Sequence, residues 1–115
     1  MNTVFVKLKE IGSDVDGALA RFMGDEELYI ECLESFTEDE NIPKLERLIR
    51  TTEYQEMFNC AHTIKGVAAN LGLTSLFNTT CILVEELRNS SYDNIETDFE
   101  AMSNEFNIFV SIMHN

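Results

Sequence analysis

Hydrophobic side chains recur every three or four residues along most of the chain, which is the spacing of helices that bury one face. The clearest example is the C-terminal segment, where apolar residues follow in alternating steps of four and three: Ile95, Phe99, Met102, Phe106, Phe109 and Met113. A seam this narrow is typical of a helix packed in a helical bundle. The pattern therefore predicts an α-helical fold.

Residues that begin or end helices divide the rest of the chain. Asp14 is expected to cap a short helix that Gly24 ends, and Asp25 is expected to cap the next helix. Pro43 is expected in the first turn of a further helix, where proline is well tolerated. Residues 4–11 fit both a helix and a strand, and a short helix is preferred because the segments that follow are helical.

The longest internal helix is predicted between residues 52 and 72. Thr52 and Gln55 form the pattern of a capping box, T-x-x-Q, and Gly72 is placed to end the helix. Thr74 is expected to cap the next helix, which should run as far as Arg88.

A similar capping pattern, Asp93 and Glu96, precedes the C-terminal seam. Because short turns join the last four long helices, neighbouring helices are expected to run antiparallel. The expected fold class is therefore all-α, an antiparallel four-helix bundle with short additional N-terminal helices. Residues 1–115 are expected to form a single domain.

The chain is strongly acidic, with 21 Asp and Glu residues against 8 Lys and Arg residues and a formal charge of −13. This charge repels nucleic acid and anionic membrane surfaces, so neither is expected as a partner. It also disfavours self-association, so a monomer is expected.

No apolar run approaches the roughly 20 residues needed to span a bilayer. Three widely spaced cysteines without metal-ligand spacing, and no signal-peptide layout at the N-terminus, predict a cytoplasmic location.

The helix over residues 52–72 has one apolar side and one unusual polar side. At about 100° per residue, its core side carries six residues: Met57, Cys60, Ile64, Val67, Ala68 and Leu71. His62 falls almost opposite the centre of this stripe. Lys65, Gly66 and Ala69 share the side of His62, and Phe58 lies at its edge. The imidazole of His62 is therefore expected to face solvent.

Gly66 and Lys65 make this exposed histidine a candidate for chemistry. A glycine inside an exposed helix costs about 1 kcal/mol relative to alanine, and the absence of a Cβ lets another molecule approach closely. Lys65 is the i+3 neighbour of His62, so its ammonium can stabilise an incoming anionic group. A tolerated glycine and a solvated lysine are the alternative interpretations.

The motif H-T-I-K-G-V-A-A-N-L-G, from His62 to Gly72, resembles the phosphoacceptor helix of histidine-containing phosphotransfer (HPt) domains. Residues 19–28, LARFMGDEEL, resemble the N-terminal signature of the same family, and the resemblance covers residues 12–113. It implies that His62 carries a phosphoryl group, that Lys65 assists, and that Gly66 provides access.

The resemblance also implies partners. The neighbouring positions expected to contact them are Phe58, Asn59, Ala69 and Asn70. The partners would be response-regulator receiver domains and a sensor histidine kinase. The receiver would supply Mg²⁺, and this chain would bind no cofactor or metal of its own. It has no nucleotide-binding glycine loop, so we expect a phosphocarrier in a phosphorelay rather than an enzyme.

One position departs from the family pattern. Many members place Glu or Gln on the following helix near the histidine, but here Val84 stands at that position, followed by Glu85 and Glu86. Whether a side chain of that helix, such as Glu85, orients His62 is left open by the sequence.

Two other functions are alternatives to phosphotransfer. A di-iron bundle needs Glu-x-x-His pairs, but His62 has Asn59 at that offset and His114 has Ser111. A helical adaptor that binds receiver or kinase domains without being phosphorylated is the main alternative.

Overall fold

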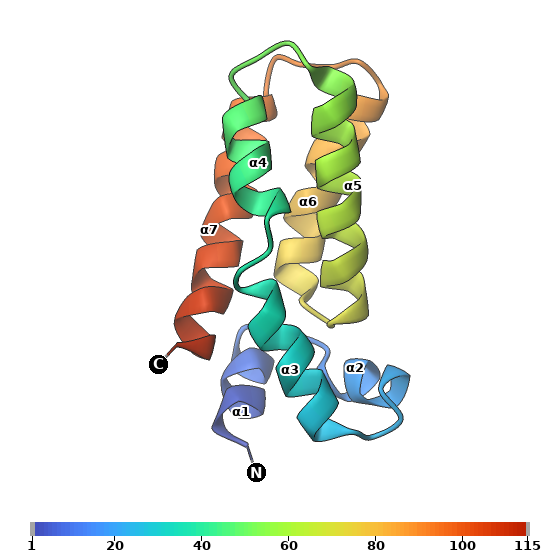
Figure 1. Ribbon diagram of the computed structural model, residues 1–115, viewed down its shortest axis with the longest axis vertical. Coiled ribbons are helices and arrows are strands. Elements are labelled where there is room, and N and C mark those ends of the chain that lie inside the picture. The colour runs from blue at the N-terminus through green and yellow to red at the C-terminus, as the bar shows by residue number, and fades with distance from the viewer. Residues whose placement is uncertain (1, 115) are drawn as a thin grey trace.

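The computed structural model describes residues 2–114, and these residues form helices and connecting turns without any strand (Figure 1). The helices are α1 (Thr3–Glu10), α2 (Val15–Arg21), α3 (Glu26–Phe36), α4 (Asn41–Leu48), α5 (Tyr54–Asn70), α6 (Thr74–Arg88) and α7 (Ile95–Met113). The predicted all-α class is confirmed, and residues 4–11, which also fitted a strand, lie almost wholly in a helix.

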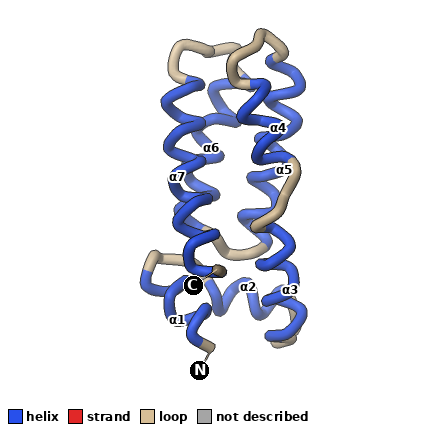
Figure 2. The backbone as a smooth tube through the Cα atoms, turned by 60° about the vertical axis from the view of Figure 1, so that its left-hand side comes forward, coloured by secondary structure: helices blue, strands red, loops and turns tan. Residues whose placement is uncertain are grey.

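Helices α4, α5, α6 and α7 form the predicted antiparallel bundle along the long axis of a molecule measuring 45 × 25 × 21 Å (Figures 1 and 2). Helix α3 continues the column of α4, and its Phe36 ring packs edge-on against Phe106 of α7 at 5.5 Å. Helices α1 and α2 cover one end of the bundle (Figure 2). Within residues 2–114, no helix has both the length and the apolar character needed to cross a membrane.

The seam predicted on the C-terminal helix forms one wall of the core. Its buried members are Ile95, Phe99, Met102, Phe106 and Phe109, while Met113 is half-buried near the helix end. The steps of four and three keep these side chains on one face of α7, which packs against α6 and α3. The core prediction for this helix is confirmed.

The predicted caps of helices α2 and α3 are confirmed. The Asp14 carboxylate accepts a hydrogen bond from the Gly17 N–H at 3.0 Å, and the Asp25 carboxylate accepts one from the Leu28 N–H at 3.0 Å. Gly24 follows α2 with a φ of +78°, a conformation that glycine adopts without strain.

The predicted caps of the three long helices are wrong. Helix α5 begins at Tyr54, two residues after Thr52, because the Thr51 hydroxyl accepts a hydrogen bond from the Glu53 N–H and tightens the preceding turn. Thr74 is the first residue of α6, and its hydroxyl donates to the Gly72 carbonyl. In α7 the cap position is Asn94 rather than Asp93, and it makes no side-chain capping bond.

The C-terminal end of α5 is fixed by donors from the N-terminal part of the chain. Arg21 donates to the carbonyls of Ala69 and Asn70 at 2.9 and 3.0 Å, and the Tyr29 hydroxyl donates to the Leu71 carbonyl at 2.7 Å. Burial raises the pKa of Tyr29 to about 12, so its hydroxyl remains a donor. These bonds satisfy carbonyls that a helix end leaves without partners.

Gly72 then ends the helix, as predicted, and the contact that it makes requires glycine. Its φ is +72°, and a Cβ at this position would lie 2.3 Å from the Asp14 carbonyl oxygen. The Asp14 N–H also donates to the Gly72 carbonyl at 2.8 Å. The N-terminal part of the chain thereby holds α5, the helix of the candidate site, firmly at this end.

Candidate functional site

His62 lies on the outer face of α5, as the sequence predicted. His62, Gly66 and Ala69 are exposed, and Lys65 is half-buried. The opposite face is buried through Met57, Cys60, Ala61, Ile64, Ala68 and Leu71. The predicted core stripe is therefore confirmed except at Val67, which is half-buried, and Ala61 is a core residue that it omitted.

Gly66 has open space where a side chain would stand. A Cβ built on it meets no heavy atom within 4 Å, and its φ is not in the left-handed region. Neither packing nor backbone conformation therefore requires glycine here, in contrast to Gly72. The absence of a side chain leaves the helix surface open one turn from His62.

A groove of about 610 Å³ runs between α3 and α5, with His62 among the residues that line it. Its α3 side is formed by Cys32, Ser35, Phe36 and Asp39, and its α5 side by His62, Thr63, Gly66, Val67, Asn70 and Leu71. The α3 wall of this groove was not predicted from the sequence. The apolar pair Cys32 and Phe36, one helical turn apart, was the available signal.

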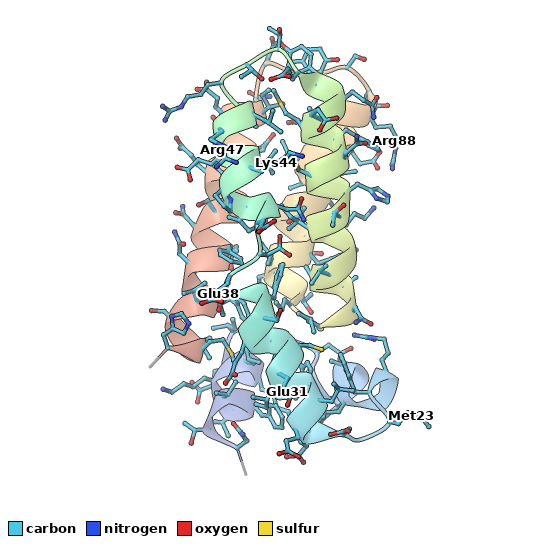
Figure 3. All side chains as sticks on the ribbon, in the orientation of Figure 1. Met23, Glu31, Glu38, Lys44, Arg47 and Arg88 are labelled. Atoms are coloured by element: carbon cyan, nitrogen blue, oxygen red, sulfur yellow. The ribbon has the colours of Figure 1, made fainter. Side chains whose placement is uncertain are left out.

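On its other flank, His62 is next to an aromatic ring. The Phe58 and His62 ring centroids are 5.6 Å apart, and the planes are tilted by 30°. The Arg88 guanidinium of α6 lies over the Phe58 ring, 5.5 Å from its centroid, and Figure 3 shows Arg88 at this edge of the bundle. Arg88 also pairs with the carboxylate of Glu85. Phe58 lies at the edge of the face that carries His62, as the helical period predicted, whereas Arg88 was not predicted.

Position 84, which the family pattern made a candidate for orienting the histidine, faces the core. Val84 is fully buried, and the Glu85 carboxylate is engaged by Arg88. Among the bonds formed by residues 2–114, none engages the side chain of His62 or Lys65. Both groups therefore remain free to meet a molecule that approaches from solvent.

The remaining predicted contact residues are spread over the same face of α5. Asn59 is exposed, and its side-chain oxygen accepts a hydrogen bond from the Gln55 amide at 3.0 Å. Asn70 lines the groove, whereas Ala69 is exposed on the flank away from it. Phe58 and Asn59 thus lie one turn before His62 on α5, and Ala69 and Asn70 lie two turns after it.

Comparison with protein families identifies the class of protein to which the chain belongs. The sequence model of the Hpt domain matches residues 27–107, which is more than half of the chain. The chain therefore belongs to the Hpt domain family. Hpt domains take part in phosphotransfer in two-component systems, as phosphocarriers rather than enzymes, and they interact with receiver domains and kinases. Comparison with curated proteins and with solved structures gives no significant match.

Proposed function

We propose that His62 is the phosphoacceptor of this domain, taking a phosphoryl group from a receiver phospho-aspartate or a kinase and passing it to another receiver aspartate. The observation that carries this proposal is the pairing of an exposed imidazole with Gly66, whose missing side chain leaves open space one turn away. An attacking imidazole needs an in-line approach by the donor, and a bulky neighbour would obstruct it.

The proposed chemistry uses a neutral imidazole. A ring nitrogen lone pair forms the N–P bond while the bond between phosphorus and the aspartyl oxygen breaks, and the aspartate leaves as a carboxylate. The second transfer reverses these steps toward another carboxylate. Charge develops on the phosphoryl oxygens during both steps. Lys65 lies three residues after His62 on the same side of the helix, so its ammonium can stabilise this charge.

We assign the Mg²⁺ that assists such transfers to the receiver partner. Within residues 2–114, no group of three or more His, Cys, Asp or Glu side chains is arranged to hold a metal ion. Metal-assisted neutralisation of the phosphoryl oxygens would then come from the partner, and this chain would supply the nucleophile and one cation.

The groove between α3 and α5 is the proposed docking surface on one flank of His62. Cys32, Phe36, Val67 and Leu71 give it apolar walls, and Asp39 adds a carboxylate to its lining. Phe58 and Asn59 extend the surface on the other side of the histidine. Apolar walls with a few polar groups at the rim are typical of protein interfaces.

A phosphotransfer assay with a panel of purified receiver domains tests the proposal. The expected result is a phosphate on His62 that is labile to acid and stable to base, and that at least one receiver removes. His62→Gln should carry no phosphate. A protein that binds receivers but never becomes phosphorylated would instead be a helical adaptor.

A further inference from the structure

Three side chains connect α6 to the imidazole of His62. The Glu85 carboxylate holds the Arg88 guanidinium, which lies over the Phe58 ring at 5.5 Å. The Phe58 ring in turn packs against the imidazole, with the centroids 5.6 Å apart. This contact series runs across the α5–α6 interface on the flank opposite the groove.

We propose that Phe58 and Arg88 are positioning residues that hold the His62 imidazole in the orientation required for phosphoryl transfer. The proposal rests on His62 being the phosphoacceptor and adds how α6 acts on it. Position 84 cannot supply an orienting polar group, because Val84 is fully buried in the core. Helix α6 instead acts on His62 through Arg88, one turn after position 84. The Arg88 guanidinium contacts the Phe58 ring, and this ring rather than a hydrogen bond orients the imidazole.

The physical basis is restriction of an otherwise mobile side chain. An exposed helical histidine with no hydrogen-bond partner samples several rotamers, and only some of them direct a ring nitrogen outward. Phe58 stands one turn before His62 on the same face and covers one side of the imidazole. A guanidinium is planar and stacks on aromatic faces, so Arg88 limits the movement of Phe58 itself.

Phe58 could instead serve only as a contact for the partner protein. Its ring is half-buried, and both Arg88 and His62 lie against it in the free protein. Much of its surface is therefore already used within the chain. A positioning role and a contact role can be distinguished by measurement. Only a positioning role changes the rate at which His62 is phosphorylated by a phosphodonor too small to use Phe58 as a contact.

The test measures phosphorylation of His62 by phosphoramidate, a small phosphodonor, alongside transfer to a receiver. Phe58→Leu should slow phosphorylation by phosphoramidate roughly two- to tenfold, and Arg88→Gln roughly two- to fivefold. Phe58→Tyr, which keeps the ring, should restore most of the rate. In NMR spectra of Phe58→Leu, the chemical shifts of the His62 ring protons should move toward the values of a solvent-exposed histidine. In Phe58→Tyr they should return to the values of the unsubstituted protein.

Tyr54→Leu is the matched control. Tyr54 stacks on Tyr92 with the centroids 3.6 Å apart, one turn before Phe58 on α5, so this variant also loses an aromatic pair between α5 and the segment after α6. It should leave the His62 proton shifts and the phosphoramidate rate unchanged. Melting temperatures of all variants separate slower chemistry from loss of fold.

Two results would overturn the positioning role. One is a normal phosphoramidate rate in Phe58→Leu with slower receiver transfer, which would make Phe58 a partner contact. The other is unchanged His62 proton shifts in both Phe58→Leu and Arg88→Gln. Failure of the phosphoacceptor proposal would look different, because the unsubstituted protein itself would then carry no phosphate on His62.

Discussion

The carboxyl groups of Glu86 on α6 and Asp98 on α7 lie within hydrogen-bonding reach of each other, and one oxygen of each is buried with no partner other than this neighbouring carboxyl group. Two carboxylates cannot bond to each other unless one of them holds a proton. The hydrogen bond to Asp98, burial and the negative charge of Asp98 together raise the pKa of Glu86 to about 7. The pair thus favours the protonated form of Glu86 in the folded protein.

Folding stability should therefore fall as the pH rises through this range. Glu86 binds its proton more tightly in the folded protein than in the unfolded chain. Its contribution to the free energy of unfolding is therefore complete below about pH 4.5 and is lost as the pH rises through about 7. Glu86→Gln mimics the protonated group, so it should raise the melting temperature at pH 8 and flatten the profile between pH 5 and pH 7. Thermal melts across pH measure this, with Glu96→Gln, an exposed site on α7, as control. An unchanged profile in Glu86→Gln would contradict the shared proton.

His62→Gln should abolish phosphorylation and leave the fold intact. The side chain faces solvent, and surface substitutions of this kind usually change the free energy of unfolding by less than about 0.5 kcal/mol. His114→Gln is the control, because His114 is the other histidine of the chain and lies at the end of α7. Phosphate retained by His62→Gln and lost by His114→Gln would move the acceptor to α7.

Lys65→Ala should slow transfer without eliminating it. A charge-assisted contact to the phosphoryl oxygens lowers the barrier by about 1–3 kcal/mol, and bond formation itself does not need the ammonium. Rapid-quench transfer rates at low salt measure the effect. Lys9→Ala removes the same charge on α1, where Lys9 pairs with Asp16, and should transfer at the normal rate. Equal rates for both variants would leave Lys65 a solvated side chain.

Gly66→Gln should raise stability and reduce activity together. No atom within 4 Å obstructs a Cβ at this position, and replacing a helical glycine stabilises a helix by about 1 kcal/mol. The longer side chain would then stand one turn from His62, where we propose that the receiver aspartate approaches. Chemical denaturation and transfer rates measure the two effects.

Gly66→Ala serves as the graded control for that substitution. It adds one methyl group, so it should gain at least as much stability as Gly66→Gln with a much smaller loss of rate. A Gly66→Gln protein that is more stable and transfers normally would remove the steric argument for the site.

The features that the sequence predicted correctly are those set by local spacing. The outward direction of His62 follows from the 3.6-residue period of α5, and the stop at Gly72 follows from the freedom of glycine at positive φ. The caps predicted at Thr52 and Thr74 do not form. The Thr51 hydroxyl accepts a hydrogen bond from the Glu53 N–H just before α5, and the Thr74 hydroxyl donates to the Gly72 carbonyl instead of capping α6. Competing short-range bonds of this kind differ by too little energy to be ranked from sequence.

The parts of the site that the sequence did not predict depend on packing between distant segments. Cys32 and Asp39 line the groove only because α3 continues the column of α4 beside α5. Arg88 meets Phe58 because α6 runs back along α5, which brings residues 30 positions apart into contact. Such pairs have no signature in the local periodicity of either helix.

The bonds at the end of α5 also determine how short a working version of this protein can be. The family match begins at residue 27, yet Asp14 and Arg21 supply three of the four hydrogen bonds that the N-terminal part of the chain donates to the carbonyls of residues 69–72. A protein trimmed to residue 27 would keep His62 and Gly66 but would lose these anchors. The end of α5, where the groove residues Asn70 and Leu71 lie, would then fray, so binding at the proposed groove should depend on residues before 27 that do not line it.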